Sequence, residues 1–71
     1  MKLVINGEDR EFETTDDSAL LSVIELLGHL ELAGIPVVVE HNKEALLPKE
    51  HKTTMLSDGD QLEIIRVVAG G

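Results

Sequence analysis

The sequence has 71 residues and a mass of 7.7 kDa, which allows one small domain with a single core. Its 6 Lys and Arg against 14 Asp and Glu give a net charge of -8, which argues against binding to nucleic acids or anionic membranes. It has no cysteine, which excludes disulfides and thiolate chemistry and fits a cytoplasmic location. No apolar run approaches the ~20 residues that span a bilayer.

The first elements predicted are two strands joined by a turn. Residues 2–6 form a strand, and residues 6–9 carry a turn signal because Asn and Gly adopt positive φ at low cost. Residues 10–14 then alternate in polarity around Phe12. With a four-residue loop, Leu3 lies opposite Phe12, and both side chains enter one core.

A helix is predicted from Ser18 to Leu27. Two aspartates and a serine precede or begin it, which are good helix-capping residues, and Gly28 stands where a C-terminal cap is expected. Apolar residues with helical spacing follow, namely Leu20, Leu21, Val23, Ile24 and Leu27. The helix is expected to pack on the strands through Leu20, Ile24 and Leu27.

The second half of the chain alternates short strands with turns. Val37–Val39 and Ala45–Leu47 are predicted strands, and Pro48–Lys52 forms one helical turn. Ser57–Asp60 is a turn, and Leu62–Val68 is the last strand. The order predicts an α+β fold, a mixed sheet that holds one helix in its concavity, in a single domain over residues 1–71.

No internal active site or metal site is predicted. The three histidines, His29, His41 and His51, lie in different segments without metal-ligand spacing. The serines are not in a nucleophile-elbow context, and no glycine-rich phosphate loop is present. A chain of this size also has little room for a deep catalytic cleft. We therefore do not expect an enzyme.

The last residues, Ala69, Gly70 and Gly71, are the candidate functional segment. They leave two interpretations open, an incidental frayed terminus or a thin, flexible arm that presents the Gly71 carboxylate. Extended at ~3.3–3.6 Å per residue, Val68–Gly71 reaches ~13 Å from the domain. That distance is enough to place a carboxylate in the active site of another protein.

Several short motifs resemble one known family. These are Asn6-Gly7-Glu8 in the first turn, Pro48-Lys49-Glu50, Asp58-Gly59-Asp60 before the last strand, and the terminal Val67-Val68-Ala69-Gly70-Gly71. Their order over the whole chain resembles the sulfur carrier proteins of thiamine biosynthesis (ThiS-like), a ubiquitin-like β-grasp family. The resemblance implies that fold, in agreement with the element order above.

The resemblance also implies a mechanism. A ubiquitin-activating-type enzyme would adenylate the Gly71 carboxylate with ATP, and sulfur from a cysteine desulfurase pathway would convert it to a thiocarboxylate. Thiazole synthase would then take the sulfur. The protein would be a co-substrate that binds no cofactor itself, because ATP is used by the activating partner. We expect it to be monomeric when free.

Docking to these partners is expected to use the sheet face that points away from the helix. Ile65 and Val67 alternate out of phase with the inward residues of the last strand, and Val4 does the same in the first. An apolar patch on an acidic surface indicates a partner site. The alternative is that a loop or the strand twist covers these three residues.

Two other functions stay open at this point. One is a carrier for a different sulfur pathway, such as the small subunit of molybdopterin synthase, which tends to be longer and to have prolines before its Gly-Gly pair. Here Arg66-Val67-Val68 occupies that place, which favours thiamine biosynthesis. The other is a noncovalent β-grasp interaction module with an incidental Gly-Gly end.

Overall fold

The computed structural model describes residues 1–13 and 21–68. A mixed five-stranded sheet has the order β2-β1-β7-β4-β5, in which β1 runs parallel to β7 and all other neighbours are antiparallel. Its strands are β1 (Lys2–Ile5), β2 (Glu8–Glu11), β4 (Val37–His41), β5 (Glu44–Leu46) and β7 (Gln61–Arg66). The other elements are β3 (Leu21–Ser22), α1 (Val23–His29), the 3-10 helix η1 (Pro48–Glu50) and β6 (Met55–Leu56).

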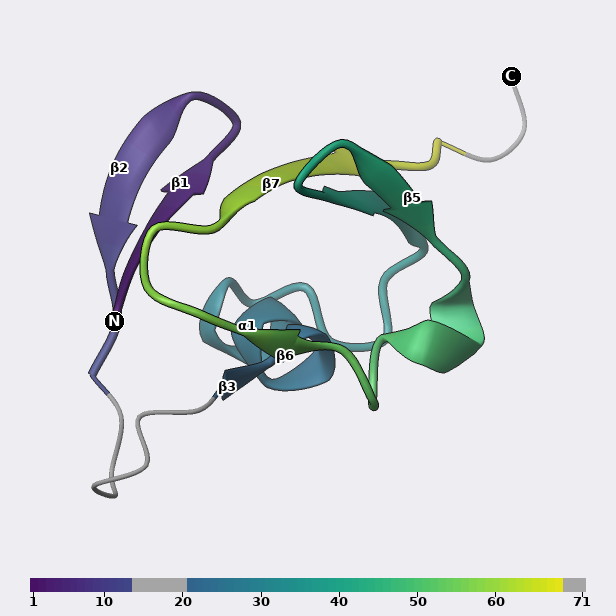
Figure 1. Cartoon of the computed structure of the whole chain (residues 1–71). Coiled ribbons are helices and arrows are strands. Elements are labelled where there is room, and N and C mark those ends of the chain that lie inside the picture. Colours follow the sequence, from purple (N-terminus) through teal and green to yellow (C-terminus); the bar gives the residue numbers. More distant parts are fainter. Residues whose placement is uncertain (14–20, 69–71) are drawn as a thin grey trace.

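The layers confirm the β-grasp fold expected from the sequence. The large sheet curves over α1, which lies in its concavity beside the small antiparallel sheet of β3 and β6 (Figure 1). β7 is the central strand, with β1 on one side and β4 on the other. The last strand therefore returns to the middle of the sheet, where its backbone can pair along both edges.

The predicted register of the first hairpin is wrong. Asn6 and Gly7 both have positive φ, 51° and 81°, and form a two-residue turn between β1 and β2. Such a turn matches the twist of the strands, so the hairpin closes two residues earlier than the predicted loop. Leu3 therefore lies opposite Arg10 rather than Phe12. Phe12 follows β2 and still reaches the core, with 9% of its surface exposed.

The described helix begins later than predicted. Its N-cap is Ser22, whose Oγ accepts a hydrogen bond from the Glu25 N–H at 3.2 Å, while the Glu25 carboxylate accepts one from the Ser22 N–H at 3.0 Å. This reciprocal pair is a capping box and fixes the start of α1. The predicted start at Ser18, with its capping aspartates and Leu20, lies outside the described residues.

The C-terminal cap is also displaced from the predicted position. Gly28 lies within α1, and the C-cap is Leu30. Glu31 follows with a φ of 60°, and the Leu32 N–H donates to the Leu27 carbonyl at 2.8 Å. Together with the bond from Glu31 N–H to the Gly28 carbonyl at 3.1 Å, this is a Schellman motif. Its left-handed residue is a glutamate, so no glycine marks it in the sequence.

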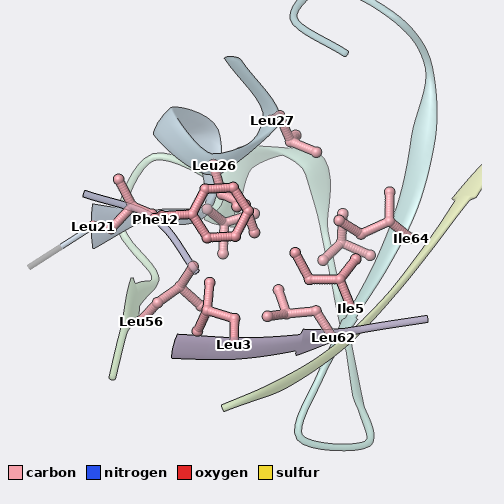
Figure 2. Close-up of a cluster of buried hydrophobic side chains, with 11 residues drawn as sticks. Leu3, Ile5, Phe12, Leu21, Leu26, Leu27, Leu56, Leu62 and Ile64 are labelled. Carbon is pink, nitrogen blue, oxygen red and sulfur yellow. The ribbon is translucent and has the colours of Figure 1, made fainter. Parts of the chain in front are cut away.

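The core lies between α1 and the concave face of the sheet (Figure 2). The prediction that Ile24 packs into it is wrong, because 40% of Ile24 is exposed and Leu26 is fully buried instead. With Ser22 as N-cap, the inward stripe of α1 is Val23, Leu26 and Leu27. The buried apolar residues are Leu3, Ile5, Phe12, Leu21, Val23, Leu26, Leu27, Val39, Leu56, Leu62 and Ile64.

Candidate functional site

β7 leads directly to the tail and is held along both edges. It forms a five-residue antiparallel register with β4 and pairs in parallel with β1. Beyond the strand, the Val67 N–H donates to the Pro36 carbonyl at 3.0 Å, whereas Val68 is 85% exposed. The backbone is thus anchored as far as Val67. The predicted tail, Ala69, Gly70 and Gly71, comes next and lies outside the described residues.

Two asparagine side chains add to the hydrogen bonds of β7. The Asn6 amide accepts from the Ile64 N–H at 2.8 Å and donates to the Ile64 carbonyl at 3.1 Å. The Asn42 side chain accepts from the Gln61 N–H at 2.9 Å. Both asparagines have left-handed backbones, with φ of 51° and 49°, which their short polar side chains tolerate well. Each turn therefore also supports the strand that carries the tail.

The carboxylate of Asp60, directly before β7, organises the turn that precedes the strand. Asp60 accepts from the Ser57 N–H at 2.9 Å and from the Asn42 amide at 3.2 Å, and its Oδ2 lies 2.7 Å from His41 Nε2. Burial alone would raise the pKa of Asp60, but the hydrogen bonds from His41, Ser57 and Asn42 and the nearby His41 charge lower it below the usual 3.8. Asp60 is thus a structural anion.

The sheet face opposite α1 has an apolar part and an acidic part. Ile65, which is 60% exposed, pairs across β7 and β4 with Val38, which is 45% exposed. Two residues further along the same face, Glu63 pairs with Glu40. Paired side chains of one register position share a face. Because Ile65 follows Glu63 in β7, the apolar pair lies nearer the tail than the acidic pair does.

The three predicted docking residues lie in two places. Val4 is half-buried and pairs with Gln61 on the same face, where Glu63 separates it from Ile65. Val67 is 50% exposed and borders a different surface, a groove that Val38 also lines. Val38 thus joins Ile65 and Val67 into one apolar surface around the base of the tail, and Val4 is apart from it.

The groove beside Val67 has a volume of about 390 Å³ and runs between α1 and the start of β4. It contains Ile24, whose exposure the sequence pattern did not predict. Val38 was not predicted either, because the run of three valines in β4 has no alternation that separates one face from the other. The groove is lined by Ile24, Leu27, Leu32, Gly34, Ile35, Pro36, Val37, Val38, Pro48, His51 and Val67.

The described parts of the chain offer neither a metal-binding cluster nor a membrane-spanning helix. Residues 1–13 and 21–68 contain no group of three His, Cys, Asp or Glu side chains that could hold a metal ion. Over the same residues, no helix is long and apolar enough to cross a membrane. The surface of Val38, Ile65 and Val67 is the candidate functional site, because it gathers exposed apolar side chains next to the predicted functional segment.

The fold and this surface define a ubiquitin-like β-grasp domain whose central strand leads into a Gly-Gly segment. Residues 3–71 match the model of the ThiS family. The chain belongs to this family of sulfur carrier proteins. It is 37% identical over 67 residues to the sulfur carrier protein ThiS of Thermus thermophilus, with 94% of this chain and 95% of that protein covered.

Two solved structures have the same fold. The crystal structure of the thiamine biosynthesis protein ThiS from Geobacter metallireducens is 36% identical, with a TM-score of 0.76 over all of both chains. A solution structure of a thiamine biosynthesis protein from the same organism gives 33% identity and a TM-score of 0.78, and covers 100% of this chain and 88% of that one.

A larger relative contains a segment like this chain. The chain is 42% identical over all 71 residues to a thiazole synthase of Paramagnetospirillum magneticum, of which it spans 20%. A segment similar to a ThiS carrier is thus part of a protein named for the thiazole-forming reaction.

Proposed function

We propose that this ThiS-family sulfur carrier of thiamine biosynthesis works through the carboxylate of Gly71. A carboxylate is a poor electrophile, so an adenylating enzyme first joins it to AMP from ATP and releases pyrophosphate. A persulfide sulfur from a cysteine desulfurase pathway then displaces AMP, a good leaving group, and a thiol reductant cleaves the acyl disulfide so formed to release the thiocarboxylate. The resulting thiocarboxylate is a stronger nucleophile than the carboxylate and carries the sulfur to thiazole formation.

The observation that carries this proposal is the contrast at the end of β7. The backbone is hydrogen-bonded on both sides of the strand and through Val67, and Val68 is 85% exposed. A rigid base with a narrow segment beyond it suits a carrier that inserts its end into a partner. Gly70 and Gly71 have no Cβ atoms, so they fit a narrow channel. Val68–Gly71 reaches ~13 Å when extended.

The partners proposed are an adenylating enzyme of the ubiquitin-activating type and a thiazole synthase. The carrier-like segment within a thiazole synthase supports the second, because one chain there combines the two. Both partners would contact the apolar surface of Val38, Ile65 and Val67, which surrounds the base of the tail. The glutamates of the same sheet face favour a partner with a basic rim.

The test is the intact mass of the protein isolated from its own cells. The expected species ends at Gly71 and has one oxygen replaced by sulfur. The purified adenylating enzyme of the same cells should support ATP–pyrophosphate exchange with the parent protein. Deletion of Gly71 should abolish exchange, because it withdraws the carboxylate by ~3.3–3.6 Å and reaction needs atoms ~3–3.5 Å apart.

The matched controls for this experiment are chains that keep the fold and change only the end. Gly71→Ala should slow exchange through the added methyl group, and one residue appended after Gly71 should block it. If the deletion and the extension both exchange at the parent rate, the carrier mechanism is wrong for Gly71, and a noncovalent module takes its place. Rescue of a thiamine auxotroph, and failure to rescue molybdopterin synthesis, separates the two sulfur pathways.

A further inference from the structure

Both arginines of the sequence line one groove that the carrier mechanism does not use. The groove has a volume of about 270 Å³ and lies between the inner face of the sheet and the segment that follows α1. Its apolar lining comes from Ile5, Ile64, Leu30 and Leu32, and its polar lining from Asn6, Arg10 and Arg66. No Asp or Glu lines it, although the chain has 14 of them.

The register of the strands places the two arginines at opposite ends of the groove. Arg10 lies opposite Leu3 on the neighbouring strand, and Ile5 lies beside Leu62 of β7. Arg66 is four residues further along β7, so the two backbones are about 20 Å apart along the strands at ~3.3 Å per residue. An extended peptide with two acidic residues meets both guanidinium groups without requiring them to converge on one point, as a single phosphate would.

The guanidinium groups are available for such a ligand. Among residues 1–13 and 21–68, neither arginine forms an ion pair, and the one found joins His41 to Asp60. Arg10 packs over the ring of Phe12 at 5.8 Å, a contact that does not neutralise its charge. Both arginines are exposed to solvent. The groove is positively charged, although the chain as a whole has a net charge of -8.

No carboxylate lines the groove itself, although Arg10 also borders a separate hollow that Asp9 and Glu11 line. Asn6 is already occupied by the backbone of Ile64, through both its amide nitrogen and its amide oxygen. Glu8 shares a face of β2 with Arg10 but does not line the groove. Glu31, in the segment after α1, does not line the groove either. The recognition chemistry is therefore two cations separated by an apolar floor.

We infer that this groove binds an extended segment of a partner protein that has acidic residues on either side of an apolar residue. In an extended chain, alternate side chains point the same way, so the pattern acidic-x-apolar-x-acidic presents all three to the groove. Arginine suits carboxylate recognition because its planar guanidinium forms paired hydrogen bonds. Since Arg66 directly precedes Val67, the bound segment would lie next to the base of the tail and fix the orientation of the carrier on its partner.

A peptide titration tests the groove without any assumption about the carrier mechanism. The probe is Ac-Glu-Ser-Leu-Ser-Glu-amide, and the control is the same peptide with lysine in place of glutamate. In NMR spectra of the labelled protein, the acidic peptide should shift the side-chain Nε–H signals of Arg10 and Arg66 and the methyl signals of Leu30 and Leu32. The lysine peptide should not. The leucine methyl shifts should be lost in the double variant Arg10→Gln, Arg66→Gln.

Any of four results would overturn the inference. The first is an absence of shifts with the acidic peptide. The second is equal shifts in the double glutamine variant, and the third is equal shifts with inorganic pyrophosphate, which would mean a simple anion site. The fourth is shifts that depend on protein concentration without peptide, which would assign the groove to a second copy of this chain. Thermal melting of each variant checks that the fold is kept.

Which protein supplies the bound segment rests on the proposed function. A second experiment tests the groove inference and the proposed function separately. Arg10→Glu with Arg66→Glu should weaken binding to the adenylating enzyme or to the thiazole synthase by about threefold to tenfold at low salt. Lys49→Glu with Lys52→Glu, two exposed charge reversals outside the groove, is the matched control. If the double variant binds both enzymes like the parent and still gains a thiocarboxylate, the groove inference fails and the proposed function stands. A parent protein that never gains a thiocarboxylate contradicts the proposed function alone.

Discussion

The two faces of β7 show which residues the fold needs and which it leaves available. Leu62 and Ile64 point toward α1 and are 2% and 7% exposed, whereas Ile65, next in the strand, is 60% exposed. Burial stabilises the inner residues by about 25 cal/mol per Å² of apolar surface, and the outer isoleucine gains little of this. The exposed apolar pair of Ile65 and Val38 beside the tail therefore adds little to stability and fits the docking surface proposed above.

The largest effect is expected from a substitution on the buried side of the sheet and helix, and it is a loss of stability. Leu26 is fully buried in α1, so Leu26→Ala should destabilise the protein by ~2–5 kcal/mol through lost contacts and a cavity. Ile24 lies two residues earlier in the same helix and is 40% exposed, so Ile24→Ala should cost less than ~1.5 kcal/mol. Urea unfolding of the two variants measures both. Equal losses would mean that Ile24 is part of the core after all.

This pair also shows how far the sequence alone could predict the fold. The hairpin, the helix, the last strand and their β-grasp arrangement follow from periodicity, turn residues and motif order. The inward face of the helix did not follow, because the pattern around Leu20, Leu21, Val23, Ile24 and Leu27 fits more than one helical phase. The phase is set by the Ser22–Glu25 capping box, and several polar residues before it are equally good caps.

The candidate site was predictable in part for a similar reason. Ile65 stands out because it alternates with residues of a long strand, and Val38 does not, because its neighbours in β4 are also valines. The support of β7 by Asn6 and Asn42 was not visible either, since asparagine in a turn is fully explained by its backbone conformation. Contacts between residues far apart in the chain, such as Arg10 and Arg66 on one groove, need the fold itself.

A charge placed on the exposed apolar pair tests whether the outer face of β7 is the docking surface. Ile65→Asp should weaken binding to the adenylating enzyme by at least about tenfold, because an apolar contact at the centre of an interface is replaced by a desolvated charge. Gln61→Asp puts the same charge on the same strand and face, away from the tail, and should have a much smaller effect. Calorimetric titration measures both, and similar affinities for the two variants would move the docking surface elsewhere.

A smaller effect is expected from the side-chain support of β7. Asn6→Gly keeps the positive φ of the turn at no steric cost but removes both hydrogen bonds to Ile64. The expected destabilisation is ~1–2 kcal/mol, in proportion to two partly buried hydrogen bonds. Thermal unfolding measures it. The control is Asn6→Asp, which keeps an acceptor for the Ile64 N–H and should recover part of the loss. An unchanged melting temperature for Asn6→Gly would show that β7 needs no such support.

The smallest effect concerns the carboxylate that begins β7, and it depends on pH. Because the hydrogen bonds to Asp60 lower its pKa below the usual 3.8, the folded protein holds this proton less tightly than the unfolded chain does. The ionised group thus contributes stability that is fully present above about pH 5 and is lost as the pH falls through the lowered pKa.

Asp60→Asn should cost ~1 kcal/mol at neutral pH, since His41 and the Ser57 N–H keep a weaker, uncharged acceptor. The difference between the two proteins, measured by urea unfolding from about pH 7 to pH 3, should be constant down to about pH 5 and shrink below it. A difference that grows in acid would mean that Asp60 is destabilising as an anion, and that burial outweighs its hydrogen bonds.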